Sequence, residues 1–223
     1  MKKLVNGIID FRKNIRPSYK ETFARLALGQ APDVLFIGCS DSRVVPNLFA
    51  STDPGDLFVI RNVGNLVPPC GGEHGRSTAD ESEAAAIEFA VTNLSVQDVI
   101  VCGHSECGAM QALLKGREKV PMPNLRGWLR HGDKALQSLL KEEAFAEHLQ
   151  THNRLSQRNV LQQVEHLMSY PIIQDKIASK QLRIHAWWFE LSGAAVHCFD
   201  PALGKFVEID EKVASRILRS LEF

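Results

Sequence analysis

Two short segments of the chain carry side chains that could bind a metal ion. Residues 39–43, CSDSR, supply one thiol, and residues 104–108, HSECG, supply an imidazole and a second thiol. Zn²⁺ takes thiolates and imidazoles in tetrahedral geometry, and three protein ligands leave a fourth position for water. The spacing of His104 and Cys107 allows both side chains to face one ion from a loop or from the first turn of a helix.

A simpler interpretation of these residues is also open. A cysteine at the end of an apolar strand is often only a small buried residue. We assign that role to Cys102 and Cys198, because each lies in an apolar strand pattern, and we assign no role to Cys70 in its glycine-rich loop. On residue type alone, the three candidate ligands fit either a metal site or the core.

A pair of opposite charges follows the first cysteine. Asp41 and Arg43 are close enough in sequence, directly after a predicted strand, to face each other beside the proposed ion. The alternative is a surface salt bridge, which contributes about 0–1 kcal/mol. The pair favours the metal interpretation without deciding it.

Short apolar runs must position both segments. Residues 34–39, VLFIGC, and 98–103, DVIVCG, are typical of strands buried on both faces of a parallel sheet. Residues 57–63, LFVIRNV, follow a turn signal at 53–55 and are interpreted the same way. In open α/β sheets, ligands bind at the carboxyl ends of the strands. Because each segment directly follows a strand, we expect the two segments to meet at that edge.

The other elements complete an α/β pattern. We expect a first helical stretch that Pro17 ends, a solvated connection over 115–134, and a mostly helical segment over 133–170. Further helices are predicted at 19–28, 82–94 and 107–114, and closing strands at 182–189 and 194–199. The fold class is α/β, with a mainly parallel central sheet and flanking helices.

We expect one domain over 1–223. It divides into an N-terminal helical arm (1–30), a core that carries the metal site (31–115), and a helical segment with closing strands (116–223).

Composition excludes several classes of protein. Apolar residues make 44% of the chain and charged residues 23%, which is typical of a globular protein. Lys plus Arg and Asp plus Glu number 26 each, so the basic excess of a nucleic-acid binder is lacking. No apolar run approaches the ~20 residues of a membrane helix, and no secretory signal is recognisable. An odd number of cysteines with free thiolates favours the cytoplasm, a reducing compartment.

The two segments together resemble the β-class carbonic anhydrases. CSDSR, followed further along the chain by GHSECG, is a specific combination. The similarity continues in Pro54–Phe58, PGDLF, in Arg61–Asn65, RNVGN, and in Ala86–Val91, AIEFAV. Residues 26–32, LALGQAP, are similar to the family's approach to the first strand, and the match spans about residues 20–115.

The resemblance implies a reaction and a cofactor. The reaction is the reversible hydration of CO₂ to bicarbonate and a proton, by attack of zinc-bound hydroxide. One Zn²⁺ per chain would be bound by Cys39, His104 and Cys107. Asp41 and Arg43 would be the family's catalytic dyad, and Asp41 would become a fourth zinc ligand in a closed, inactive state.

The resemblance also implies a substrate pocket and an assembly. CO₂ has little polarity, so its pocket should be small and apolar, with a donor where the charge of bicarbonate develops. The substrate-binding residues would be Gln30, Phe58, Val63, Gly64, Phe89 and Gly108. In the family this pocket lies at a dimer interface, which implies a homodimer or an assembly of dimers. The N-terminal helices would pack on the dimer partner.

Other functions compete with this one. A non-catalytic zinc or redox-sensing protein with a closed Cys₂-His-Asp site would have the same sequence features. A hydrolase of a linear relative of CO₂, such as CS₂, could use the same scaffold. A nucleotide-binding protein lacks support, because no Gly-x-Gly-x-x-Gly or Walker pattern follows a predicted strand.

Overall fold

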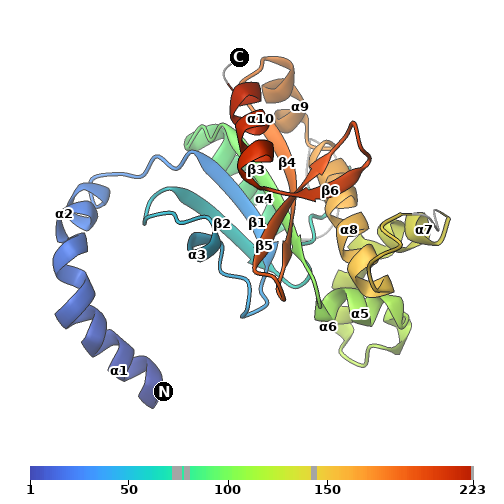
Figure 1. Cartoon of the computed structure of the whole chain (residues 1–223), viewed down its shortest axis with the longest axis horizontal. Helices are drawn as coiled ribbons and strands as arrows, with labels where there is room; N and C mark the ends of the chain where they lie inside the picture. The colour runs from blue at the N-terminus through green and yellow to red at the C-terminus, as the bar shows by residue number, and fades with distance from the viewer. Residues whose placement is uncertain (72–76, 78–80, 142–144, 222–223) are drawn as a thin grey trace.

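The protein is built on one six-stranded sheet (Figure 1). The computed structural model describes residues 1–71, 77, 81–141 and 145–221. The strands are β1 (Val34–Cys39), β2 (Leu57–Asn62), β3 (Asp98–His104), β4 (Arg183–Glu190), β5 (Ala195–Asp200) and β6 (Lys205–Glu208). Their order is β2-β1-β3-β4-β5-β6. The first four strands of that order are parallel, and β5 and β6 extend the sheet antiparallel. The predicted single-domain α/β fold with a mainly parallel sheet is confirmed; its division at 1–30, 31–115 and 116–223 stays a prediction.

Strands β1 and β3 lie between two hydrophobic cores, one on each face of the sheet. Successive side chains of a strand point to opposite faces, so Leu35 and Ile37 of β1 enter the larger core, and Phe36 enters a smaller one with Ile100. Both strands are buried along almost their whole length. The interpretation of these apolar runs as strands buried on both faces is therefore correct.

Helices cover the two faces unequally. The larger core packs against α4 (Glu81–Glu88), α5 (Gly108–Leu114), α7 (Asp133–Lys141) and α8 (Thr151–Leu167). The short α3 (Pro46–Phe49) packs on the opposite face through the ring of Phe49. The other helical segments are η3 (Phe89–Asn93), η4 (Arg117–Lys119), α6 (Pro123–Trp128), η5 (Leu129–Gly132), α9 (Pro171–Ala178) and α10 (Glu211–Leu221).

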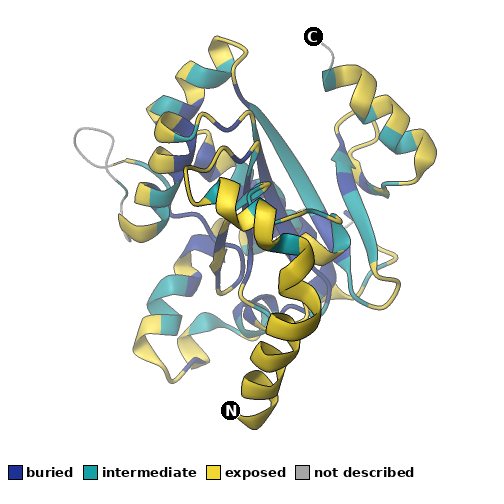
Figure 2. Cartoon of the chain, turned by 90° about the vertical axis from the view of Figure 1, so that its left-hand side faces the viewer, coloured by how far each residue is buried: buried dark blue, intermediate teal, exposed yellow. Residues whose placement is uncertain are grey.

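The N-terminal arm projects from the body as α1 (Lys2–Asp10), η1 (Phe11–Ile15) and α2 (Arg16–Leu26). No residue of these three segments is buried, and Figure 2 shows the arm as almost wholly exposed. Pro17 does not end the helical stretch as predicted. It lies in the first turn of α2, where the missing N–H of proline costs no intrahelical hydrogen bond.

Two other predictions were wrong in part. Residues 57–63 form an edge strand rather than a strand buried on both faces, and Val59 is 37% exposed. The connection 115–134 is not simply solvated, because it contains η4, α6 and η5 with Leu129 buried. Trp128 of α6 also donates a hydrogen bond to the carbonyl of Val63 at 2.8 Å. Among the described helices, none combines the length and apolarity needed to cross a membrane.

A close approach of α8 to β3 fixes the helix behind the strand end. Gly103, the penultimate residue of β3, faces α8 without a side chain. A Cβ at this position would lie 2.6 Å from Cγ2 of Val160 and 3.3 Å from the backbone oxygen of Ser156. Glycine is therefore required here by packing, and α8 can lie directly against the strand that ends at His104.

We expect Gly103→Ala to destabilise the protein. The added methyl group meets backbone as well as side chain, and overpacking of this kind costs typically about 1–3 kcal/mol. Chemical denaturation should show a lower free energy of unfolding. Gly127→Ala is the matched control, because its Cβ would meet nothing nearer than Nη1 of Arg130 at 3.7 Å. Equal stability of the two variants would contradict the packing argument.

Candidate metal centre

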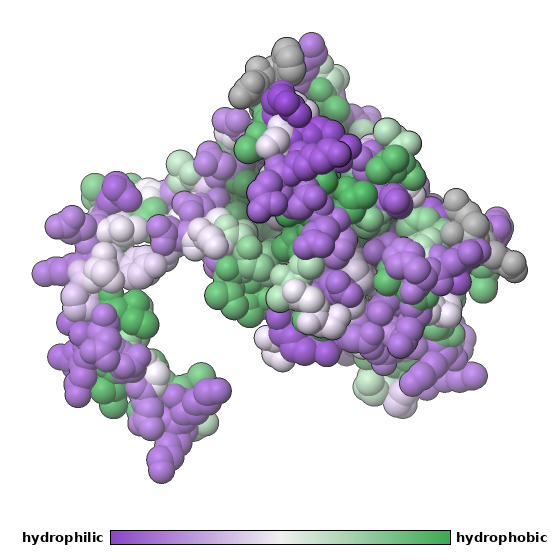
Figure 3. All heavy atoms as spheres, in the orientation of Figure 1, coloured by the Kyte–Doolittle hydropathy of each residue, from purple (hydrophilic) through white to green (hydrophobic). Residues whose placement is uncertain are grey.

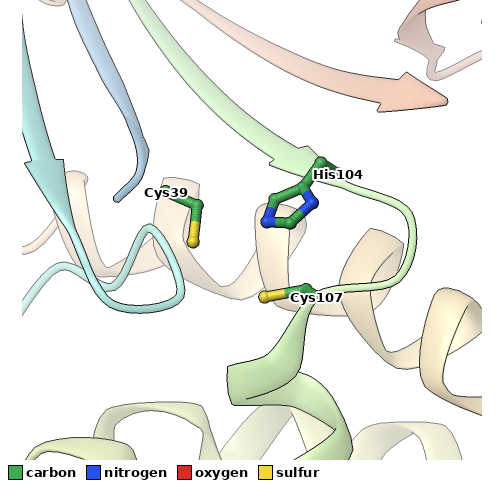
Figure 4. Close-up of side chains that lie close together, drawn as sticks. All are labelled: Cys39, His104 and Cys107. Carbon is green, nitrogen blue, oxygen red and sulfur yellow. The ribbon is translucent and has the colours of Figure 1, made fainter. Parts of the chain in front are cut away.

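Three buried ligand atoms converge at the carboxyl edge of the sheet. Cys39 ends β1, His104 ends the neighbouring parallel strand β3, and Cys107 directly precedes α5. Their candidate ligand atoms all lie within 4.8 Å of one another, and Figure 4 shows the side chains pointing toward a common centre. All three residues are buried. The structure thus brings together the three residues singled out from the sequence, and their role as metal ligands stays a prediction.

The donor set fits a zinc ion. Nδ1 of His104 lies 2.8 Å from the carbonyl oxygen of Ser105, which can only accept, so Nδ1 carries the proton. In a neutral imidazole Nε2 is then the acceptor, and it is buried without a hydrogen-bond partner among the described residues. A buried acceptor is costly when unpaired. A cation between Nε2 and the two sulfurs would satisfy this acceptor. A hydrogen bond from the other ring nitrogen, such as the bond from Nδ1 to the carbonyl of Ser105, typically orients a metal-bound histidine.

The two thiols favour one negative charge even without a cation. The hydrogen bond from Cys107 lowers the pKa of Cys39, against the opposing effect of burial, and the N–H of Gly64 adds to this at 3.4 Å from Sγ. The same bond and burial raise the pKa of Cys107. Only a nearby cation would allow both sulfurs to be thiolates, the form that binds a metal.

Gly64 must itself be glycine. Its φ is +87°, a conformation that side chains disfavour, and a Cβ would lie 3.0 Å from that of Ala109. The loop therefore reaches Cys39 only because this position lacks a side chain.

Asp41 lies beside the three ligand atoms but is bound to Arg43. The guanidinium donates from Nε to Oδ1 at 2.9 Å and from Nη2 to Oδ2 at 2.7 Å, and the N–H of Arg43 donates to Oδ1 at 3.0 Å. These bonds hold the pKa of Asp41 well below its usual range, although partial burial opposes the shift. Oδ2 of Asp41 lies 4.0 Å from Nε2 of His104. The carboxylate thus lies near the candidate metal position, and Arg43 binds both of its oxygens.

Arg61 fixes the backbone that carries Cys39 and Asp41. Its Nε donates to the carbonyl of Cys39 at 3.0 Å, and its Nη2 donates to the carbonyl of Asp41 at 2.7 Å. Arg61 lies in the RNVGN segment, and its sequence pattern alone predicted no role for it. Its one available signal was a charged residue at the end of an apolar strand.

Helix α8 holds the loop between His104 and Cys107, and also the loop that follows β2, through a row of polar side chains. Four of them, spaced three or four residues apart, point to backbone groups of the loops and are buried: Asn153, Ser156, Asn159 and Gln163. Ser156 donates to the carbonyl of His104 at 2.7 Å, and Asn159 donates to that of Gly64 at 3.1 Å. Gln163 accepts from the N–H of Val67 at 2.9 Å. This row was not predicted from the sequence, where its only signal is polar residues at helical spacing.

A cavity of about 320 Å³ opens beside the candidate metal position. Its lining is mainly apolar and consists of Cys39, Ser40, Asp41, Val63, Gly108, Ala109, Ala112 and Leu125. Of the predicted substrate residues, Val63 and Gly108 therefore line this cavity, whereas Gly64 contacts the sulfur of Cys39.

The other predicted substrate residues lie elsewhere within one copy of the chain. Phe58 and Phe89 pack on each other, with ring centroids 5.9 Å apart, and Gln30 is exposed after the end of α2. A single chain does not bring these three residues to the cavity lining.

Comparison with known proteins finds relatives along nearly the whole chain. A family model described as "Carbonic anhydrase" matches residues 34–196. A carbonic anhydrase of Synechococcus elongatus is 41% identical over 197 residues, which cover 88% of this chain and 70% of that protein. One of Pseudomonas aeruginosa is 35% identical over 211 residues, which cover 95% of this chain and 93% of the relative.

Solved structures similar to this chain are also carbonic anhydrases. The β-carbonic anhydrase CcaA aligns with a TM-score of 0.85 at 37% identity, over 93% of this chain and 98% of that one. One of two tetrameric β-carbonic anhydrases from the filamentous ascomycete Sordaria macrospora aligns with a TM-score of 0.76 at 30% identity, over 92% and 98%. The chain therefore belongs to the carbonic anhydrase family, in its β class.

We expect Cys39→Ala to abolish metal binding. The variant keeps only two of three protein ligands, and an open tetrahedral site should not hold its ion tightly without the third. Metal content per chain, measured after dialysis, should fall to background. Cys198→Ala is the matched control, since Cys198 is a buried cysteine on β5 outside the ligand group. Stoichiometric metal in Cys39→Ala would remove Cys39 from the ligand set.

Proposed function

We propose that this chain catalyses the reversible hydration of CO₂ to bicarbonate and a proton, with one Zn²⁺ bound by Cys39, His104 and Cys107. One observation carries the proposal: a buried Cys-His-Cys group with an unpartnered Nε2 lies beside a mainly apolar cavity, in a chain of the β-class family. When bound, zinc makes hydroxide available near neutral pH by lowering the pKa of water from 15.7 to about 7.

Asp41 and Arg43 would orient the nucleophile. The bonds from Arg43 keep Asp41 ionised at neutral pH, so the carboxylate can only accept a hydrogen bond. By accepting the hydrogen of the attacking hydroxide, Asp41 would direct the oxygen lone pair toward CO₂. Arg43 also keeps Asp41 from becoming a metal ligand itself. The pairing seen here weighs against a closed, non-catalytic metal site.

The cavity suits a small molecule without charge. Val63 and Gly108 line it in one copy, and we place Gln30, Phe58 and Phe89 at the contact between two copies, where they would complete the substrate pocket. Support comes from the exposed apolar surface near the edge strand, where Val63 is 44% and Phe89 42% exposed. The amide of Gln30 would then donate a hydrogen bond where the negative charge of bicarbonate develops.

The arm gives the strongest indication of a homo-oligomer. Its large exposed apolar residues are Leu4, Val5, Ile8, Ile9, Phe11, Ile15 and Phe23. Figure 3 shows hydrophobic patches, in green, on the arm. Patches of this kind mark protein contacts. We propose that α1 and α2 pack on a second copy, forming a dimer or an assembly of dimers. None of the five cysteines forms a disulfide with another, which supports a reducing compartment such as the cytoplasm.

The dyad gives the most direct test of the proposed reaction. Arg43→Ala should keep its zinc but lose CO₂ hydration, because nothing then holds Asp41 away from the metal. Loss of a partner that orients groups at a metal site costs typically about 10–100-fold in activity. Stopped-flow hydration assays and zinc content would be measured on the same preparations.

Asp41→Asn serves as the contrasting variant. It has no carboxylate to offer to the metal, and it accepts a hydrogen bond less strongly than Asp41. It should keep water at the fourth position and show reduced activity. Full activity in Arg43→Ala would exclude the dyad mechanism, and a zinc-loaded native protein without hydration activity would exclude the proposed function.

We expect Leu4→Glu combined with Ile8→Glu to dissociate the assembly. Both side chains lie on α1 and are exposed in one copy, by 65% and 68%, so charges there would oppose burial against a partner. Analytical ultracentrifugation should show a smaller species than the native protein. Leu203→Glu is the control, because Leu203 is a comparably exposed leucine, at 58%, in the turn before β6. An unchanged mass in the arm variant would exclude the arm contact.

A further inference from the structure

The turn between two metal-ligand candidates has an unusual backbone. His104 and Cys107 are joined by Ser105 and Glu106, and Glu106 has a φ of +57°. A residue with a side chain rarely adopts this left-handed region unless its surroundings hold it there. The conformation turns the chain sharply enough for both ligands to face the same centre (Figure 4).

Asn153 of α8 binds Glu106 through both ends of its amide group. Oδ1 of Asn153 accepts from the N–H of Glu106 at 2.8 Å, and Nδ2 donates to Oε1 of Glu106 at 3.0 Å. His152 lies next to the other carboxylate oxygen, with Nε2 2.9 Å from Oε2. Backbone and side chain of Glu106 are thus held from the same helix turn, and Asn153 is 8% exposed.

The same turn reaches the dyad. Nη2 of Arg43 donates to the carbonyl oxygen of Glu106 at 3.1 Å and to Oδ2 of Asp41 at 2.7 Å. The guanidinium is planar and rigid, so the position of this carbonyl helps to set the direction of the fork that holds Asp41. A change in the backbone of Glu106 would turn the carbonyl and release one of the contacts of Arg43.

We propose that Asn153 is a positioning residue for the reaction. By holding Glu106 in the left-handed turn, it aims the Glu106 carbonyl at Arg43, and Arg43 in turn keeps Asp41 directed away from the metal. The proposal rests on the carbonic anhydrase activity proposed above. It gives α8 a role in selecting the state of the dyad, in addition to supporting the ligand loops.

If Asn153 had only a structural role, a different result of its substitution would be expected. Asparagine in the first turn of a helix commonly binds a free N–H of its own helix. Here both amide atoms contact Glu106 instead. If Asn153 only stabilised α8, its removal would lower stability without changing which group occupies the fourth position at the metal.

The test measures Asn153→Ala as the zinc-loaded full chain. We expect kcat/KM for CO₂ hydration to fall by about 10–100-fold, the usual effect of losing an orienting partner near a metal site. Zinc content should stay the same, and X-ray absorption at the zinc edge should show added carboxylate coordination. Gln162→Ala is the matched control, because Gln162 lies on α8 with the same 8% exposure and donates to Glu165 of its own helix at 3.0 Å.

A double-mutant cycle tests whether Asn153 acts on the dyad through the turn at Glu106. Glycine adopts a φ near +57° without support, so Glu106→Gly should make the turn less dependent on Asn153. Asn153→Ala should then cost much less activity in the Glu106→Gly background than in the native one. Equal losses in both backgrounds would overturn the proposal, as would a loss in Gln162→Ala as large as that in Asn153→Ala.

A second variant keeps the proposal testable if Asn153→Ala does not fold. Asn153→Asp retains an acceptor for the Glu106 N–H but sets a carboxylate against that of Glu106. It should show a smaller activity loss with partial carboxylate coordination, and native coordination would overturn the proposal. If the native protein lacks hydration activity, the proposed function fails. The metal coordination in Asn153 variants would still decide whether this residue positions Asp41.

Discussion

The structure depends on keeping two thiols and an imidazole nitrogen together, out of water, at one edge of the sheet. Such a group is unfavourable by itself, because the first thiolate opposes the second and Nε2 of His104 has no partner among the described residues. A divalent cation would remove both problems at once. The sheet brings two of the candidate ligands together, since β1 and β3 are adjacent parallel strands with Cys39 and His104 at their ends.

Helix α8 provides the rigidity that this arrangement needs. Strand ends continue into loops, and loops by themselves do not hold side chains to within a fraction of an ångström. Here the polar side chains of one buried helix face bond to the backbone on both sides of the site. Satisfied buried polar networks of this kind make a structure specific as well as stable. The glycine at position 103 lets the helix come close enough to make these bonds.

The contacts of Asp41 favour a catalytic metal site over a closed one. Asp41 lies near the candidate metal position, yet Arg43 binds its carboxylate and Arg61 binds its backbone carbonyl. The carbonyl of Glu106 accepts a further hydrogen bond from Arg43. An ion bound by Cys39, His104 and Cys107 would thereby keep a position for water, beside an apolar cavity. The arm and the edge strand leave apolar surface exposed on the single chain. We propose that contacts between copies cover this surface and enclose the substrate.

The sequence alone determined the central strands, the candidate ligand residues and the Asp41–Arg43 pair. These follow from local patterns: continuous apolar runs predict buried strands, and residue types at close spacing predict a shared site. The predictions for Pro17, for the connection 115–134 and for the burial of β2 were wrong. Each depends on which other segments pack nearby, and the residues of the segment itself do not determine that.

Only the tertiary structure decided what holds the site. Asn153 lies far along the chain from Glu106, and Arg61 meets the backbone of Cys39 and Asp41 across a strand pairing. Which partner a polar side chain reaches depends on how distant elements are brought together. The proposed role of Gln30 depends on the assembly in the same way. Gln30 is exposed in one copy, and its proposed partner belongs to another copy. Local chemistry named the ligands, and long-range packing fixed their geometry.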